Sequence, residues 1–261
     1  MATTFAENKE QLLKQAEEKL LASFDDQDEY TIQQKIALTC RVLHEHGHGS
    51  GVAGQITARG PEPGIYYTQR FGLAFDEIKA SNLLLVNEDL DVLQGKGMPN
   101  PANRFHSWVY RARPDAQCII HTHAMYTAAL SQLEQPLVIS HMDNCLLYED
   151  VEFVGAWPGV PFGNEDGDMI SQALNGKRAL LMAHHGLLVA GGSVEEACML
   201  AVTFERAARL QLMSMAAGEI KPIDPQKGRQ AHDWLIKPKH TKVAFFNMAR
   251  RVLDRHPDCF E

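Results

Sequence analysis

The sequence has little of what nucleic-acid-binding and membrane-embedded proteins need. Its 261 residues carry a formal net charge of −8 at pH 7, from 25 lysines and arginines against 33 aspartates and glutamates. Nucleic acids and anionic membranes attract dense positive charge, so this balance argues against both as partners. No apolar run approaches the roughly 18 residues that a membrane-spanning helix requires. Arg206 and Arg209 fall in a helical pattern with apolar residues, which is typical of a solvated helix face.

Cysteine is also scarce, and its spacing excludes the common cysteine motifs. The five cysteines are odd in number, scattered and mostly set in apolar runs: Cys40, Cys118, Cys145, Cys198 and Cys259. This pattern is typical of reduced, buried thiols rather than of a disulfide framework. Residues 1–19 are polar and charged, without the apolar centre of a secretory signal. We therefore expect a cytoplasmic protein.

Nucleotide-binding motifs are missing as well. The glycine-rich stretch His46–Gly51 alternates histidine and glycine, but it has the spacing of neither a phosphate-binding P-loop nor a dinucleotide-binding turn. Nothing here favours a dehydrogenase. Glycines allow positive φ angles and expose backbone N–H groups, so the stretch ending at Gly51 remains a candidate loop for an anion or a substrate.

The chain contains enough apolar residues to fold as one unit. Hydrophobic residues make up 45% of it and charged residues 22%, and neither an internal repeat nor a linker interrupts the sequence. We expect a single domain over residues 1–261, with a core at about 30–220 and a helical extension at about 221–261. Strand and helix patterns alternate loosely, with hairpin-like neighbours early on, which favours a mixed sheet flanked by helices.

Several predicted elements decide where functional side chains should lie. The capping residue Thr31 predicts a helix that ends at about Glu45. Two later runs of strand-forming residues, separated by a turn, predict a hairpin. The expected strands of the hairpin and of the later sheet are Gln55–Arg59, Gly64–Thr68, Gln117–His123, Leu137–Ser140 and a long strand Ala179–Val189. Residues 221–238 read as a proline-punctuated connection before a last helix. The pair Phe245-Phe246 in that helix either completes a neighbouring subunit's site or forms an oligomer contact.

Two histidines, His121 and His123, end the apolar run that begins at Gln117. Side chains at positions i and i+2 of a strand point to the same face, so both imidazoles should emerge side by side. A lone histidine is more often a hydrogen-bonded structural residue. Two of them on one strand, together with a second histidine pair elsewhere, favour a metal site.

The second pair, His184-His185, lies at the end of another apolar run and precedes Gly186. Adjacent strand residues face opposite ways, so only one of the pair can join the first two histidines. We expect His185 to be the third ligand and His184 to orient the site from outside it. Three neutral imidazoles with an open coordination position make a Lewis-acid centre.

A catalytic metal also needs an acid or base nearby. His141 and Asp143 open the segment after the predicted strand 137–140 and are our candidates for that role. Solvent exposure or helix capping would explain each of them equally well, since a carboxylate early in a helix is stabilised by the helix dipole. His106, on the helix that precedes the His121 strand, is either a fourth ligand or a packed histidine.

Together these residues resemble the class II aldolase and adducin head-domain family over about residues 30–220. The resemblance rests on an ordered set of motifs: His121-x-His123, His184-His185-Gly186, the helix Arg104–Pro114, the strand Cys118–Ile120, the turn Val52–Thr57 and the loop Arg70–Phe75. It implies a three-layer α/β/α fold with a central mixed, largely antiparallel sheet. It also implies a homotetramer with active sites between subunits.

The resemblance further implies a divalent metal on His121, His123 and His185, most often Zn²⁺ and sometimes Mn²⁺ or Co²⁺. Family enzymes stabilise an enolate at the metal, and their reactions include aldol cleavage, epimerisation, dehydration and decarboxylation. His141 stands where some aldolases carry a catalytic tyrosine, and Asp143 stands near the working glutamate of the dehydratases.

Three departures from the aldolases change the expected substrate. Asn100-Pro101-Ala102 replaces their Ser-Ser-Glu, which removes the catalytic glutamate. Gln55 replaces a phosphate-binding asparagine, and Phe71-Gly72 replaces a Thr-Gly pair. We therefore expect a lyase for a small, non-phosphorylated hydroxy- or oxo-carboxylate or sugar-derived substrate, with Gly51, Gln55, Phe71 and Gly72 lining its site. The alternative is a non-catalytic, adducin-like binding domain.

Overall fold

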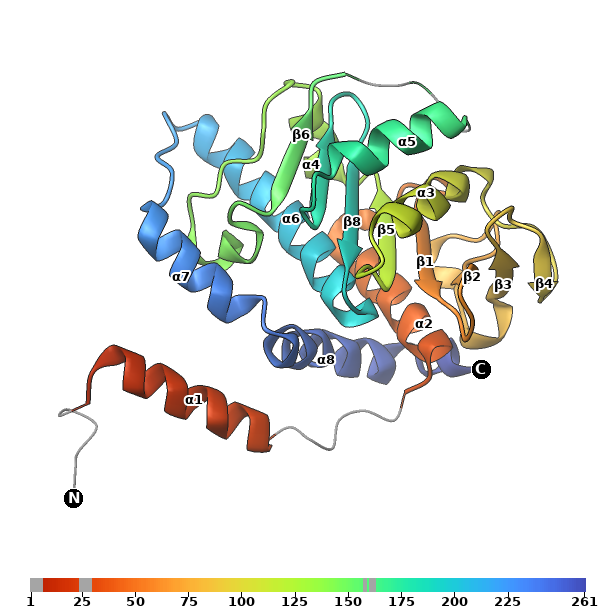
Figure 1. Cartoon of the computed structure of the whole chain (residues 1–261), viewed down its shortest axis with the longest axis horizontal. Coiled ribbons are helices and arrows are strands. Elements are labelled where there is room, and N and C mark those ends of the chain that lie inside the picture. Colours follow the sequence, from red (N-terminus) through yellow and green to blue (C-terminus); the bar gives the residue numbers. More distant parts are fainter. Residues whose placement is uncertain (1–6, 24–29, 157–158, 160–162) are drawn as a thin grey trace.

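An eight-stranded sheet forms the centre of the described part of the chain, in the order β4-β3-β2-β1-β5-β8-β7-β6 (Figure 1). This computed structural model describes residues 7–23, 30–156, 159 and 163–261. The strands are β1 Gln55–Arg59, β2 Ile65–Thr68, β3 Leu84–Asn87, β4 Val92–Gln94, β5 Cys118–Thr122, β6 Val151–Val154, β7 Ala179–Met182 and β8 Leu187–Gly191. Only β6 and β7 pair in parallel within this sheet. The expected mixed, largely antiparallel sheet is confirmed.

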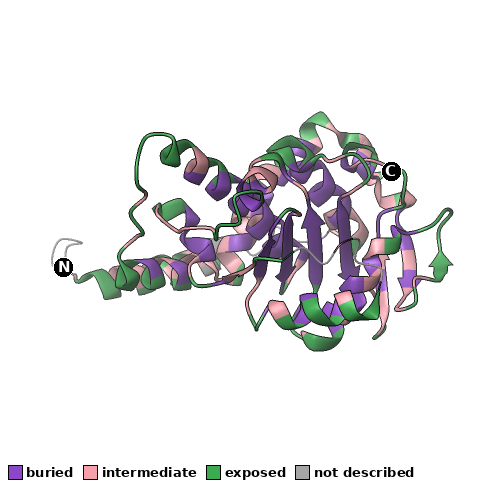
Figure 2. Ribbon diagram, turned by 90° about the horizontal axis from the view of Figure 1, so that it is seen from above, coloured by how far each residue is buried: buried purple, intermediate pink, exposed green. Residues whose placement is uncertain are grey.

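Helices cover both faces of the sheet and complete the expected three layers (Figure 2). The helices of the described residues are α1 Lys9–Ser23, α2 Ile32–Leu43, α3 Arg104–Ala112, α4 Met125–Ser131, α5 Asn164–Ala173, α6 Val194–Met215, α7 Pro225–Leu235 and α8 Pro238–Arg255. Of these, α1 stands away from the sheet (Figure 1). The alternation of side chains along the strands divides the core in two. Ile56 and Ile120 pack with α2, α6 and α8, whereas Ile119 packs with α3 and α5. No helix of the described residues is long and apolar enough to cross a membrane.

One end of the sheet gathers the loops that carry the candidate site. β1 and β5 are antiparallel, and Gln55 at the start of β1 lies opposite His121 near the end of β5. β8 begins opposite that same end, with Leu187 paired to Thr122. The residues before β1, after β5 and before β8 therefore emerge together.

The long strand expected over Ala179–Val189 is wrong. β7 and β8 are two antiparallel strands joined by a tight turn. The Met182 N–H donates to Gly186 O at 3.0 Å, and the His185 N–H donates to Met182 O at 3.2 Å. His184, with φ of 55°, takes the left-handed conformation that closes the turn.

Two further expectations also fail. Leu137–Ser140 is not a strand, because its backbone bonds to other elements: Val138 N donates to Gln211 Oε1 at 2.7 Å, and Ile139 O accepts from Ile223 N at 2.9 Å. The connection 221–238 contains helix α7, which starts with Pro225 after the capping residue Asp224.

The carboxy-terminal aromatic pair is part of the chain's own core. Phe245 and Phe246 on α8 are 0% and 2% exposed and pack against the α2 and α6 side of the sheet. Both side chains are already buried within their own chain. They therefore neither complete a neighbouring subunit's site nor form an oligomer contact, the two roles expected for them.

Candidate metal centre

Three imidazoles meet at the site end of the sheet. His121 lies in β5, His123 follows directly after that strand, and His185 lies in the β7–β8 turn. Their ring centroids are 4.7 to 4.9 Å apart, and the Nε2 atoms of His121 and His123 are separated by 3.1 Å. One nitrogen from each ring lies within 4.8 Å of the others. The structure thus brings together the three residues that the sequence nominated as ligands.

The geometry of the β7–β8 turn explains how His185 reaches the other two imidazoles. Gly186 runs so close to β5 that a Cβ atom there would lie 2.4 Å from Thr122 O and 2.9 Å from His123 Cδ2. Real Cβ atoms do not approach so closely, so only glycine fits this position. The absence of a side chain at Gly186 lets the turn pack against the end of β5 and places His185 beside His123.

Hydrogen bonding determines which ring nitrogen of His121 faces the other two imidazoles. Its Nδ1 lies 2.8 Å from the carbonyl oxygen of Leu187. A carbonyl can only accept, so Nδ1 carries the proton and Nε2 keeps its lone pair. Phe105 on α3 packs edge-on against the ring at 5.5 Å and restricts its orientation.

Burial keeps all three imidazoles neutral. It lowers the pKa of His121 well below its usual range, and the neighbouring His185 and His123 rings lower it further. Burial likewise lowers the pKa of His123 and brings the pKa of His185 to about 4. At neutral pH the cluster therefore offers lone pairs rather than positive charges.

The donor set fits a divalent transition metal. Zinc–nitrogen bonds of roughly 2.0–2.1 Å at tetrahedral angles place ligand nitrogens about 3.3 Å apart, close to the separation of the His121 and His123 nitrogens. Among the described residues, no aspartate, glutamate or cysteine joins the cluster. Ala102, at the position of the aldolase glutamate, packs instead with the apolar core on the α3 side.

Two buried side chains that the sequence did not nominate hold this strand end in place. His48 Nδ1 lies 2.8 Å from Thr122 Oγ1, on the opposite face from the three imidazoles. Glu205 on α6 accepts three hydrogen bonds at the start of α4, from the backbone N–H groups of Tyr126 and Thr127 and from Thr127 Oγ1, at 2.7 to 2.8 Å. For His48, the only sign in the sequence was that it lies in the alternating histidine–glycine stretch. Nothing in the sequence pointed to Glu205.

The four expected substrate-lining residues lie in loops or strand ends at the site end. Gln55 begins β1 and is 4% exposed. Gly51 precedes that strand with φ of 62°, and Gly72 follows β2 with φ of 92°. Phe71, beside it, is 38% exposed, and its backbone N–H donates to Met98 O at 2.8 Å. Their role in substrate binding remains a prediction.

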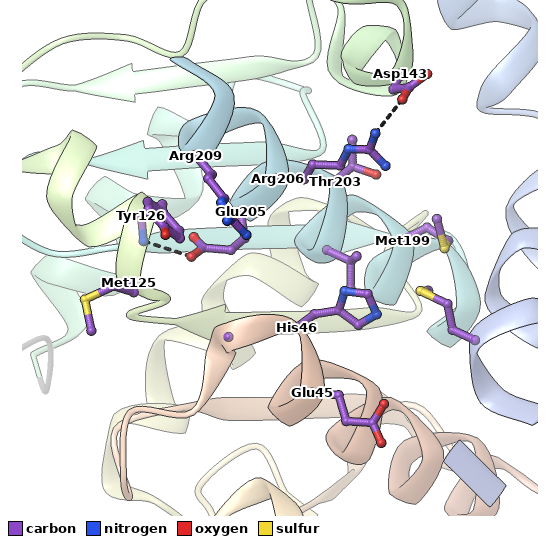
Figure 3. A pocket seen from close by; sticks show the side chains of 13 residues that line it. Glu45, His46, Met125, Tyr126, Asp143, Met199, Thr203, Glu205, Arg206 and Arg209 are labelled. Atoms are coloured by element: carbon purple, nitrogen blue, oxygen red, sulfur yellow. Dashed lines mark hydrogen bonds and ion pairs between the residues drawn. The ribbon is translucent and has the colours of Figure 1, made fainter. Parts of the chain in front are cut away.

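The two acid–base candidates do not join the imidazoles within this chain. Asp143 Oδ2 lies 2.7 Å from Arg206 Nη2 and lines a cavity of about 680 Å³ beside α6 (Figure 3). None of the three imidazoles lines that cavity. His141 is exposed and accepts at Nδ1 from the Asp143 N–H at 3.2 Å, as an N-cap does. Arg206 is exposed, as expected of a solvated helix face, and it pairs with Asp143 at the cavity wall.

The two other histidines that the sequence suggested for this site, His184 and His106, do not join the three imidazoles. His184 Nε2 lies 2.8 Å from Glu134 Oε1 at the surface, so the expectation that it orients the site is wrong. His106 is buried on α3 with Nδ1 2.8 Å from Thr57 Oγ1, which agrees with a packed histidine rather than a fourth ligand.

Comparison with known families agrees with this fold. The Class II Aldolase and Adducin N-terminal domain matches residues 34–212. The chain belongs to this family. This class II aldolase-type chain is 31% identical over 211 residues to 4-hydroxy-3-prenylphenylpyruvate oxygenase/4-hydroxy-3-prenylbenzoate synthase of Streptomyces roseochromogenus subsp. oscitans, which covers 80% of this chain and 76% of that protein. It is 30% identical to decarboxylase NovR of Streptomyces niveus, over 69% of this chain and 67% of the relative.

A solved structure supports the same placement. L-fuculose 1-phosphate aldolase from Glaciozyma antarctica PI12 superposes on this aldolase-type chain with a TM-score of 0.80 and 28% identity, over 88% of this chain and 92% of that one. A protein named as an aldolase thus shares this fold, and a protein named as a decarboxylase is similar in sequence.

Proposed function

We propose that this protein is a divalent-metal-dependent lyase that cleaves a carbon–carbon bond or removes a carboxylate from a small substrate. The observation that carries the proposal is the convergence of three neutral imidazole nitrogens at one end of the sheet. A protein with only a binding role has no physical reason to bury three such rings side by side, because each loses hydration there. This favours the enzyme over an adducin-like scaffold.

His121, His123 and His185 would hold the ion. Zn²⁺ suits three imidazoles best, and Mn²⁺ or Co²⁺ are alternatives that imidazole also binds. When bound, such an ion polarises a substrate oxygen as a Lewis acid. The chain's own contribution is to present the His121 lone pair through the Leu187 carbonyl and to keep the neighbouring rings uncharged.

The substrate class follows from what the site lacks and from the relatives. No carboxylate of the described residues joins the imidazoles, so an ion held there would keep its full positive charge and favour an anionic ligand. One relative is named for a phenylpyruvate, which is a 2-oxo-carboxylate, and another is named a decarboxylase. We propose a non-phosphorylated hydroxy- or oxo-carboxylate or a sugar-derived substrate, bounded by Gly51, Gln55, Phe71 and Gly72.

Proton transfer would then come from a second subunit. His141 and Asp143 are exposed, and the cavity that Asp143 lines includes none of the imidazoles. In a homotetramer with sites between subunits, the same residues of a neighbouring chain would act at this site. We propose that arrangement for this cytoplasmic enzyme.

The test combines metal analysis with turnover. Protein purified without chelators should hold about one divalent ion per chain and should decarboxylate or cleave members of a panel of small 2-hydroxy- and 2-oxo-carboxylates. The His123→Ala variant should lose both metal and turnover. His184→Asn, a change at an exposed histidine to a residue that also tolerates the left-handed backbone of this turn, should keep both. Turnover that is unchanged in His123→Ala would refute the proposal.

A further inference from the structure

Two buried side-chain oxygens on the α3 side of the sheet have no hydrogen-bond donor among the described residues. They are Oε1 of Gln55, whose residue is 4% exposed, and Oδ1 of Asn103, whose residue is 1% exposed. Leaving a buried acceptor unpaired costs about 1–3 kcal/mol. Native proteins pair nearly all such groups, so this pair of oxygens indicates that something donates to them.

The orientation of the Gln55 amide is determined by its other contact. Its Nε2 donates to the backbone carbonyl oxygen of Ala53 at 2.7 Å. A carbonyl cannot donate, so turning the amide over would place two acceptors against each other. The atom left without a partner is therefore the amide oxygen and not the nitrogen.

The same reasoning fixes Asn103. Its Nδ2 lies 2.8 Å from Thr68 Oγ1, and that hydroxyl donates its only proton to Ile56 O at 2.8 Å. The hydroxyl must then accept from the asparagine, which requires the amide nitrogen to face it. Both unpaired atoms are acceptors.

The strand register places Gln55 next to the metal candidates. Gln55 lies directly opposite His121 in the antiparallel β1–β5 pair. Directly opposite residues project to the same face with Cβ atoms about 4.5–5.5 Å apart. Thr57, two residues along the same face, pairs with Thr68, which holds Asn103. The two oxygens therefore lie on the α3 side of the sheet, where the imidazoles also lie.

We propose that Gln55 Oε1 accepts a hydrogen bond from a hydroxyl group of the substrate, and that Asn103 Oδ1 accepts a second such bond. This deepens the proposed function and rests on ligand binding at His121, His123 and His185. A hydroxyl can donate, so it satisfies a buried acceptor. A phosphate monoester is mostly a dianion without a proton at neutral pH, because its second pKa is about 6, so its oxygens are repelled by both carbonyl-type oxygens. The site thereby selects hydroxy-carboxylates over phosphorylated compounds.

The test compares two probes that differ by one hydroxyl. Glycolate and acetate are titrated into Co²⁺-loaded protein, and binding is followed by calorimetry and by the visible spectrum of the ion. Glycolate chelates better than acetate in any protein, so the informative quantity is the ratio of their dissociation constants. Gln55→Met preserves side-chain length but removes the acceptor, and it should reduce the glycolate preference about tenfold. Phosphoglycolate, which carries a phosphate ester in place of that hydroxyl, should bind the variant at least as well as the wild type.

Two further variants make the result interpretable. Gln94→Met is the matched control on the exposed strand β4, and it should leave the ratio unchanged. Gln55→Leu provides a second apolar replacement if Gln55→Met folds poorly, as judged by thermal unfolding. If the metal-loaded Gln55 variants keep the wild-type ratio of glycolate to acetate dissociation constants, this inference is wrong but the metal proposal stands. Failure of the wild-type protein to hold Co²⁺ would overturn the metal proposal, and this inference with it.

Discussion

At the scale of single residues, the candidate centre depends on Gly186 as much as on the imidazoles. The backbone there passes close to β5, and a side chain would meet both Thr122 O and the His123 ring. A one-carbon addition would therefore push the turn that carries His185 away from the strand that carries the other two rings. Substitution of a residue that supports metal ligands in this way typically lowers the metal affinity by about 10- to 100-fold.

The first prediction follows from this contact. Gly186→Ala should weaken Zn²⁺ binding by about tenfold or more, because the added Cβ displaces His123 or His185. Competition with a chromophoric chelator measures the affinity. Gly192→Ala is the matched control, since its Cβ would meet no atom closer than 3.6 Å. Equal affinities in the two variants would show that the close approach at Gly186 does not hold the site together.

Sequence reasoning located part of this site for sound physical reasons. His121 and His123 follow from the two-residue period of a strand, which depends only on local geometry. His185 was nominated from the same period, yet it reaches the cluster through a turn that a continuous apolar run conceals. Asp143 was nominated by its position in the chain, but its ion pair with Arg206 depends on the packing of α6, which no local pattern encodes.

At the scale of elements, α7 anchors the segment that leads from His141 to β6. Gly228 on α7 packs against the ring of Tyr148, and Arg229 pairs with Glu149. His232 lies 3.5 Å from Asp150 Oδ2 and 3.1 Å from Asp233 Oδ1.

The second prediction concerns the pH dependence of this contact. The nearby carboxylate of Asp150, aided by Asp233, raises the pKa of His232 above its usual value, although burial and Arg229 oppose the shift. A raised folded-state pKa stabilises the fold fully below about pH 6.5, the unfolded-state pKa, and the contribution is lost as pH rises through the folded-state pKa.

His232→Gln should therefore destabilise the protein most at about pH 6 and least at about pH 9. Urea unfolding of the variant and the wild type across that range measures the difference in unfolding free energy. His184→Gln, at the surface, serves as the matched control. A destabilisation that stays constant or grows with rising pH would contradict the assignment. Arg178 keeps Asp150 paired in the variant, with a 2.6 Å contact, so the fold should persist.

The third prediction concerns the helix that follows His123. Glu205 satisfies the first N–H groups of α4, and Glu205→Gln would turn an amide N–H₂ group toward a backbone donor. We expect a loss of about 1–3 kcal/mol in unfolding free energy and a lower melting temperature. Thermal unfolding measures it, with the exposed Glu219→Gln as control. Wild-type stability in Glu205→Gln would exclude this capping role.

Elements with local signals were predictable, and those that depend on distant partners were not. Thr31 forms the expected capping box with Gln34 at the start of α2. The hairpin of β1 and β2 also matches its turn signals. The stretch 137–140 looked like a strand because its apolar residues are locally strand-like, but Gln211 and Ile223 occupy its backbone groups. Such competition is decided by tertiary contacts.

At the scale of the whole molecule, the antiparallel topology gathers the β1, β5 and β8 loops at one sheet end, while His141 and Asp143 lie along α6. The resemblance of the motifs to one family predicted this fold better than periodicity alone did. The oligomer was predictable only through that resemblance, since no local pattern of residues specifies which surfaces of two chains meet.

The fourth prediction tests that oligomer. Light scattering should give about 116 kDa for four chains of 29.1 kDa. Unfolding and refolding an equal mixture of inactive His123→Ala and His141→Ala chains should restore about a quarter of the wild-type turnover, because sites between subunits can combine one intact part from each. No recovery in the mixture, with tetramers formed, would place His141 at its own chain's site, and full turnover of His141→Ala alone would place it outside catalysis.

The most direct measurement of the central claim is the X-ray absorption spectrum of the metal in protein loaded with Zn²⁺. Coordination by His121, His123 and His185 predicts three imidazole nitrogens at about 2.0–2.1 Å, with the remaining position filled by oxygen, and loss of that pattern in His121→Ala. A spectrum without imidazole scattering, or one that is the same in His121→Ala, would contradict it.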